Sequence, residues 1–399
     1  MSKFSLIRCY HNGVNPVLVG RNLDTKIKSE FTIPSSTFHP YFYVQDEQGE
    51  YLSIEGKKLK KVGCSKPGDV PTERAKYKKT WESDIPFARR YLIDKGIKSG
   101  FEVSGTTITP LDVSYNPSVI FFDLEAYPTG ARIDEYKDSI TAVSLRDNSE
   151  DAKVISIVVG IEAFNEKDLL TKLVKILELS DTDILCSYSD YDINLLKARL
   201  RANGMHLNLN RTNYFDLLQS YRNLFNKSSY KLRNVAVEEG ITTEKQPQLD
   251  YKKLFDEDKL ELKRINKNHT RWASELDKKH KIISYFWELK SYVGLESIED
   301  TQYSSVLIDT LLLREYLGKY ILPTKIQHEK VPYEGAIVLT PQKGIFQGVA
   351  VLDMAAYYPN VILSEKLDPT IFYAYQSWKK SGKRMTDFLD ELQNMRERL

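Results

Sequence analysis

The chain has 399 residues, of which 41% are hydrophobic, and its 57 basic and 55 acidic residues leave a formal net charge of +2. This length predicts roughly two to four domains with cores of their own. The near balance of charge excludes a uniformly basic, histone-like coat, although local basic patches stay possible. The three cysteines fit no zinc spacing, and no segment has the length or purity of a membrane span or a signal peptide. We therefore expect a cytoplasmic protein with no membrane contact.

Residues 1–110 predict a β-rich N-terminal domain. Val17–Val19 and Tyr41–Val44 are rich in β-branched and aromatic residues, as strands are. The polar stretch Glu47–Glu50 predicts a turn into a further strand at Tyr51–Leu52.

Residues 111–282 have an α/β pattern. Apolar runs predict three strands first, and alternating helices and strands follow. The predicted elements are strands at 119–122, 140–145 and 152–159, a helix at 166–179, a strand at 183–188 and a helix at 192–202. This order is typical of an RNase H-like domain. Two charged or amphipathic helical stretches follow at 255–292 and 304–316, and we expect residues 283–330 to return to the N-terminal domain.

Two carboxylates stand at the end of the first buried strand of this pattern. Alternate residues of a strand point to the same face, so Asp123 and Glu125 should project together while Leu124 turns to the core. Nucleases that use two divalent ions need several carboxylates around ions about 3.5–4 Å apart. The pair is therefore a candidate for part of such a site.

The segment Val349–Ile362 resembles the first catalytic motif of family B DNA polymerases. Its apolar residues predict a buried strand that delivers Asp353 to the strand's end, followed by a Tyr-Pro turn. Upstream, Tyr333-Glu334-Gly335-Ala336 and Pro341–Gly344 follow the family's order and spacing. The resemblance implies that Asp353 holds catalytic magnesium, that Tyr358 lies under the sugar of the incoming nucleotide, and that Tyr333 and Gly335 lie on the template path. Residues 331–399 would then be the first part of a palm and the start of fingers.

The N-terminal region is similar to archaeal replicative members of this family. The similarity lies in Phe38–Tyr43 and in Asp84–Gly96. In those enzymes a pocket in this region grips template uracil, and the alternative is that the same residues only shape a core. The positions that carry over are Pro40, Pro67, Val70, Phe87 and Arg90.

The resemblance also assigns exonuclease roles. Asp123 and Glu125 match the first motif of the family's 3′-5′ exonuclease, and Asp192 matches the second. For the third motif, Asp309 lies too close to Tyr333, so the better placement puts His269 where the family has a metal-binding aspartate. It also puts Ile265 where the family has a tyrosine. We therefore expect weak or lost proofreading, and for His269 itself the sequence favours a surface position on a polar helix.

Two later polymerase motifs do not occur in these 399 residues. They are Lys-x3-Asn-Ser-x-Tyr-Gly, which binds the triphosphate, and Tyr-x-Asp-Thr-Asp, which brings a second metal-binding aspartate. The resemblance therefore implies a DNA polymerase with two-metal Mg²⁺ sites that is incomplete in this chain.

Several interpretations stay open. A second polypeptide could supply the fingers, the rest of the palm and the thumb, or the chain could be a piece of an ordinary polymerase. It could also be a non-catalytic DNA-binding scaffold or a stand-alone 3′-5′ exonuclease. The implied partners are a primer-template and a dNTP, and a sliding clamp is a further candidate.

Overall fold

The computed structural model describes residues 1–130, 133–244, 249–325, 335, 337–365, 378, 380 and 382. It divides into two compact units. The first unit comprises residues 1–39 and 86–315, and the second comprises residues 40–85 and the described residues from 316 onward. The predicted domain boundaries at residues 110, 282 and 330 stay predictions.

The first unit begins with a five-stranded antiparallel sheet in the order β3-β2-β1-β8-β9. The helix α2, Phe87–Asp94, packs on β1 and β2. The predicted strand at Val17–Val19 is confirmed within β2. The strands are β1 (Ser2–His11), β2 (Pro16–Asn22), β3 (Lys28–Thr32), β8 (Gly100–Ser104) and β9 (Thr107–Leu111).

A second, mixed sheet of the first unit has the order β12-β11-β10-β13-β14. Its central strand β10 runs antiparallel to β11 and parallel to β13. Three strands come first along the chain, and the later strands alternate with helices, as the sequence predicts. The elements are β10 (Val119–Ala126), β11 (Ile140–Asp147), β12 (Ile155–Val158), α3 (Glu166–Ser180), β13 (Ile184–Ser187), α4 (Asp190–Ala202) and β14 (Asn213–Asp216).

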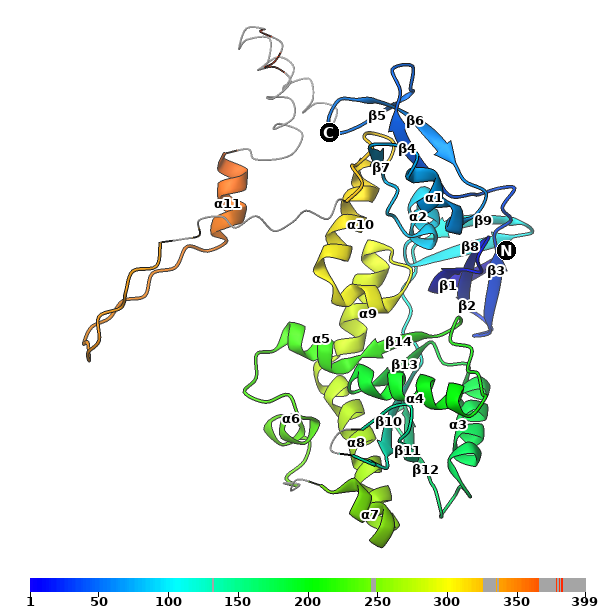
Figure 1. Ribbon diagram of the computed structural model, residues 1–399, viewed down its shortest axis with the longest axis vertical. Helices are drawn as coiled ribbons and strands as arrows, with labels where there is room; N and C mark the ends of the chain where they lie inside the picture. The colour runs from blue at the N-terminus through cyan, green and yellow to red at the C-terminus, as the bar shows by residue number, and fades with distance from the viewer. Residues whose placement is uncertain are drawn as a thin grey trace. The chain divides into compact units, whose positions relative to one another are not determined.

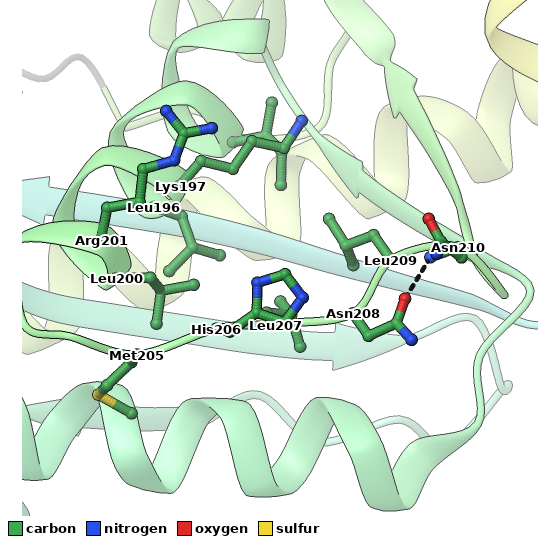
Figure 2. A pocket seen from close by; sticks show the side chains of 11 residues that line it. Leu196, Lys197, Leu200, Arg201, Met205, His206, Leu207, Asn208, Leu209 and Asn210 are labelled. Atoms are coloured by element: carbon green, nitrogen blue, oxygen red, sulfur yellow. Dashed lines mark hydrogen bonds between the residues drawn. The ribbon is translucent and has the colours of Figure 1, made fainter. Parts of the chain in front are cut away.

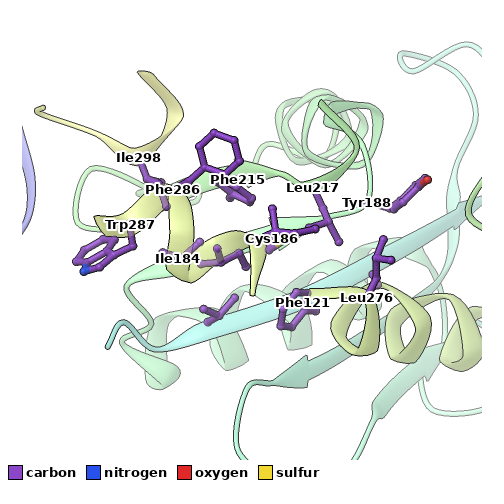
Figure 3. Packing of buried hydrophobic residues seen from close by; sticks show 14 of the residues in the cluster. Phe121, Ile184, Cys186, Tyr188, Phe215, Leu217, Leu276, Phe286, Trp287 and Ile298 are labelled. Carbon is purple, nitrogen blue, oxygen red and sulfur yellow. The ribbon is translucent and has the colours of Figure 1, made fainter. Parts of the chain in front are cut away.

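Alternation along β10 separates the two faces of the mixed sheet. Phe122 and Leu124 pack with apolar residues of α3 and α4. Phe121 points to the other face and joins a buried cluster with residues of α8 (Lys259–His280) and α9 (Ile282–Val293). Figure 3 shows this second cluster, in which Phe121, Cys186 and Phe215 lie near Phe286 and Leu276. The sheet is therefore buried on both faces, which explains the apolar runs in its sequence.

The two sheets of the first unit are joined by apolar and by charged contacts. Ile7 and Val19, from the first sheet, belong to the same buried cluster as Phe121. Arg21 of β2 donates to Asp183, directly before β13, through Nη2 at 2.6 Å and Nε at 3.2 Å. Asp183 is fully buried, so this ion pair lies inside the unit.

The last helices of the first unit run back to its N-terminal strands. Lys290 of α9 donates from Nζ to the backbone oxygen of Leu6 at 2.8 Å, and Arg89 pairs with Glu296 at 2.7 Å. The helix α10, Ser304–Tyr316, has the predicted bounds. The remaining helices of this unit are α5 (Leu217–Leu224), α6 (Leu232–Glu238), α7 (Tyr251–Glu257) and the short 3₁₀ helix η2 (Ile298–Gln302) (Figure 1).

The second unit contains a four-stranded sheet in the order β5-β6-β4-β7. The predicted strands at Tyr41–Val44 and Tyr51–Leu52 are confirmed as β4 and β5. Single bridges join Ser53 to Ile321 and Trp81 to Pro323, so residues after 316 complete this unit. Its elements are β4 (Tyr41–Gln45), β5 (Tyr51–Leu52), β6 (Lys58–Gly63), η1 (Pro67–Asp69), α1 (Val70–Arg74) and β7 (Thr80–Trp81).

The predicted buried strand ahead of Asp353 is wrong in this structure. Residues 337–354 have no regular hydrogen-bonded structure, and the side chains of Val351 and Leu352 are 88% and 95% exposed. A strand needs a neighbour for its backbone groups, and no strand of the described residues pairs with this segment. The helix α11, Tyr357–Ser364, follows it.

Tyr333, which the resemblance places on the template path, lies outside the described residues. Among the helices that are described, none combines the length and the apolar character needed to cross a bilayer.

Candidate metal centre

Strand β10 and helix α8 build an acidic centre in the first unit. Asp123 and Glu125 lie two and four residues after Phe121 on β10, so their side chains point to the same face as Phe121 and toward α8. Leu124 is buried on the opposite face. The prediction that the two carboxylates project together is therefore confirmed. Both carboxylates lie where β10 pairs with β11, with Asp123 opposite Ser144 and Glu125 opposite Ala142.

His269 completes this centre from α8. Its Nδ1 lies 3.3 Å from Glu125 Oε1 and 3.5 Å from Asp123 Oδ2, and its side chain is 13% exposed. The expectation of a surface histidine is wrong, because α8 packs against β10 and β11 through the face that carries His269. The structure thus places His269, and not Asp309 of α10, beside the two carboxylates.

Asn266 orients one of the carboxylates. Its Nδ2 donates to Asp123 Oδ2 at 2.7 Å and to the backbone oxygen of Asp123 at 3.1 Å. Its own Oδ1 accepts from the hydroxyl of Ser144 on β11 at 2.5 Å. Asn266 was not among the predicted site residues, although its spacing of three residues from His269 puts both on one face of a helix.

Asp192 approaches the centre from the first turn of α4. Its side chain is buried, and the backbone N–H of Leu124 donates to it. Further along α4, Arg199 holds the helix to α3 through bonds of 2.8 and 2.7 Å to Glu166. Asp192 is close enough for the charges of the β10 carboxylates to act on it, as the sequence predicts.

The proton affinities of these groups show that negative charge is crowded here. Burial raises the pKa of Glu125 to about 7, His269 opposes this shift, and the charge of Asp123 adds to it. Burial, followed by the charges of Asp123 and Glu125, raises the pKa of Asp192 well above its usual range. For His269 burial disfavours the charged ring, but its hydrogen bonds to Asp123 and Glu125 outweigh burial and raise its pKa to about 10. Such a centre favours a bound positive charge.

Two tyrosines lie within electrostatic reach of the centre. Burial and the charges of Glu125 and Asp123 raise the pKa of Tyr251, on α7, above its usual range. The pKa of Tyr191, next to Asp192 on α4, rises for similar reasons, burial first and then the charge of Asp192. Both phenols therefore stay protonated and able to donate near the acidic groups. No sequence motif marked Tyr251, because it comes from a helix outside the predicted exonuclease motifs.

The three potential ligands of the acidic centre suit one divalent ion better than two magnesium ions. Asp123, Glu125 and His269 offer ligand atoms that all lie within 4.8 Å of one another. Magnesium prefers oxygen ligands, and His269 supplies nitrogen where a further carboxylate would be needed. The residues present therefore do not fit the pair of Mg²⁺ ions that the resemblance implies.

The predicted polymerase-site residues lie in the second unit. Asp353 is exposed and lies in irregular chain, and Gly335 is likewise exposed. Tyr358 lies on α11 with 78% of its side chain exposed. The structure does not test the roles of Asp353, Tyr358 and Gly335, and these roles stay predictions.

The residues of the predicted uracil pocket are divided between the two units. Phe87 and Arg90 belong to α2 of the first unit, where Phe87 stacks on Phe38 at 5.5 Å between ring centroids. Pro40, Pro67 and Val70 belong to the second unit. The pocket stays a prediction.

A separate pocket lies beside α4. It has a volume of about 330 Å³ and is lined by the helix and by residues 205–210. Figure 2 shows Lys197 and Arg201 at one side and His206 among apolar side chains. None of its lining residues belongs to the acidic centre.

Comparisons with known proteins extend these observations. The profile of "DNA polymerase family B" matches residues 297–389, which include Asp353 and Tyr358. "DNA polymerase 1" of Pyrococcus abyssi is 27% identical over 86% of this chain and 52% of its own length. "DNA polymerase" of Thermococcus litoralis is 26% identical over 76% of this chain and 20% of its own length. The chain therefore spans only about a fifth to a half of these relatives.

A solved structure is also similar in fold. The family B DNA polymerase of Pyrobaculum calidifontis matches with a TM-score of 0.74 and 19% identity, over 93% of this chain and 57% of that chain. The mixed α/β fold with several sheets is thus the fold of part of that protein. Together, the comparisons confirm the resemblance that the motifs indicate.

Proposed function

We propose, from the premise that this chain is a relative of archaeal family B DNA polymerases, that it carries part of such an enzyme. Residues 1–315 would include an RNase H-like, exonuclease-type domain, and the region of Asp353 would contribute to the nucleotidyl-transfer site. The observation that carries the proposal is that one chain combines the buried acidic centre on β10 with a family B profile match across Asp353 and Tyr358.

The strand order of the first unit supports the exonuclease-type assignment. Three strands, β12-β11-β10, are followed by β13 and β14 on the other side of β10. Asp123 and Glu125 stand on the central strand, and Asp192 lies in the first turn of the helix after β13. This arrangement is the one that the RNase H-like prediction requires of its carboxylates.

Asp353 would be one of the metal-binding carboxylates of the polymerase site. Divalent ions at such a site position the triphosphate and neutralise developing charge in phosphoryl transfer. Tyr358 would lie under the nucleotide sugar, and Tyr333 with Gly335 would follow the template. The substrates would be a DNA primer-template and a dNTP, with DNA affinity that falls as salt rises.

Polymerisation would need residues from outside these 399. The lysine that binds the triphosphate and the second aspartate occur in motifs absent from the sequence. They would come from a second polypeptide or from a continuation of the chain. Contact with a sliding clamp and a cytoplasmic location remain predictions.

Primer extension tests this proposal. The chain alone, given primer-template, dNTPs and Mg²⁺ or Mn²⁺, should show no extension above background. Adding a polypeptide that contains the two missing motifs, encoded in a neighbouring reading frame, should restore extension. Robust extension by the isolated 399 residues would contradict the proposal.

Proofreading by the acidic centre should be weak with magnesium. The reason is His269, which removes one oxygen ligand from the set. A mismatched primer incubated with the chain and Mg²⁺ should be trimmed slowly or not at all. Rapid trimming that Asp123→Ala abolishes would contradict this expectation.

A non-catalytic DNA-binding scaffold is the second candidate, favoured only by the histidine in the acidic centre. It predicts DNA binding without extension even when the missing motifs are supplied. The same complementation assay therefore separates the two functions.

A further inference from the structure

The acidic centre has a mixed set of ligands. Two carboxylates from alternate positions of β10 face one imidazole from α8, and all three side chains are largely buried. Their nearest ligand atoms converge within 4.8 Å. The set therefore has one nitrogen and at least two oxygens, with Asp192 nearby.

The distances within the set resemble the edges of a coordination polyhedron. A charge-assisted N–H···O bond is usually about 2.7–2.9 Å long, and the observed separations of 3.3 and 3.5 Å are longer. Ligands at about 2.1 Å from a tetrahedral ion lie about 3.4 Å apart. A single N–H shared between two carboxylates makes two long, weak bonds, whereas one ion can bind all three groups at once.

The surroundings fix two of the three ligands. Asn266, itself held by Ser144, donates to Asp123 Oδ2 at 2.7 Å. The ring of Trp272, fully buried on the same helix, lies 5.6 Å from the ring of His269. Hydrogen bonds to ligating carboxylates and packing around ligating histidines are common around metal ions in proteins.

We propose that Asp123, Glu125 and His269 form a site for a single divalent transition-metal ion, such as Co²⁺ or Zn²⁺, in preference to Mg²⁺. Imidazole nitrogen suits these ions, whereas Mg²⁺ demands near-ideal octahedral oxygen ligands. Three protein ligands leave a position open for water or a phosphate oxygen. The inference deepens the exonuclease part of the proposed function and rests on it only for the identity of a substrate.

Cobalt binding gives a readout that does not depend on activity. The full chain is stripped of metal and titrated with Co²⁺ at about pH 8, because an ion has to displace the proton of His269. We expect one equivalent to bind, with visible absorption typical of four or five ligands. A large excess of Mg²⁺ should fail to displace it.

Three variants separate the ligand set from other histidines. His269→Ala should weaken Co²⁺ binding by at least about tenfold and change the spectrum. His269→Asp should let Mg²⁺ compete far better, because it exchanges nitrogen for oxygen. The matched control is His206→Ala in the pocket beside α4, which should change nothing. Hydrogen exchange of β10 and α8 peptides checks that each variant is folded.

Several results would overturn the inference. These are an unchanged Co²⁺ spectrum in a folded His269→Ala, displacement of Co²⁺ by Mg²⁺ at similar concentration, or absence of stoichiometric binding. The proposed polymerase function fails separately, in the extension assay. Each result therefore bears on one proposal only.

Discussion

The buried carboxylate of Asp183 should be a main determinant of stability in the first unit. It accepts from Arg21 Nη2 at 2.6 Å, from Tyr115 Oη at 2.7 Å and from the backbone N–H of Ser118 at 3.0 Å. Asp183→Asn would leave the nearly buried Arg21 without its closest counter-charge. Removal of one partner of a buried ion pair costs about 3–5 kcal/mol.

Asp181 offers a matched control two residues away. It pairs with the same Arg21 at 2.9 Å, but its side chain is 40% exposed. Exposed pairs contribute about 0–1 kcal/mol, so Asp181→Asn should cost no more than this. The comparison keeps the chemical change constant, while burial and the number of buried hydrogen-bond partners differ.

Urea unfolding of the full chain, read by hydrogen exchange of β2 and β13 peptides, measures both variants in the first unit. The double variant Arg21→Met/Asp183→Asn should be destabilised by less than the sum of the single changes, because it leaves no uncompensated charge at this pair. Equal costs for Asp183→Asn and Asp181→Asn would refute the reasoning.

Three further expectations concern the same unit. Burial lowers the pKa of Lys290 to about 7, so between about pH 7 and 10.5 the unfolded chain binds more protons there and stability should rise with pH by up to about 1.4 kcal/mol per unit. Lys290→Met should flatten that rise in urea midpoints measured at several pH values, and parallel curves would contradict it. Asn266→Ala should cost about 1–3 kcal/mol by leaving Ser144 without its acceptor; the same unfolding measurement would show no loss if that bond were unimportant. On α3, Leu173→Ala should cost about 2–5 kcal/mol because Leu173 is fully buried, whereas Leu179→Ala, at a side chain 75% exposed, should change stability by within about 0.5 kcal/mol; similar losses at both sites would be inconsistent with the packing.

Much of the first unit could be predicted because its signals are local. Apolar runs and helical spacing give the strands β10 and β11 and the helix α3 to within a few residues. Alternation along a strand likewise places Asp123 and Glu125 together. These features depend on neighbours in sequence, which is what the residue pattern records.

The rest depends on contacts between distant residues. Pairing of β1 with β8 joins segments about 100 residues apart, and no local pattern specifies it. His269 is polar on a charged helix, so its side chain suggests solvent, and only packing of α8 on β10 turns it to the carboxylates. Asn266 was missed for the same reason. The apolar run before Asp353 has the composition of a strand, yet composition alone supplies no partner for its backbone.

The most direct measurement is single-turnover extension by the complemented enzyme, comparing Asp353→Asn with Asp123→Asn. If Asp353 is a metal-binding carboxylate of the nucleotidyl-transfer site, Asp353→Asn abolishes incorporation while Asp123→Asn leaves it intact. Incorporation that survives Asp353→Asn, or that is lost only with Asp123→Asn, would contradict the assignment of synthesis to the region of Asp353.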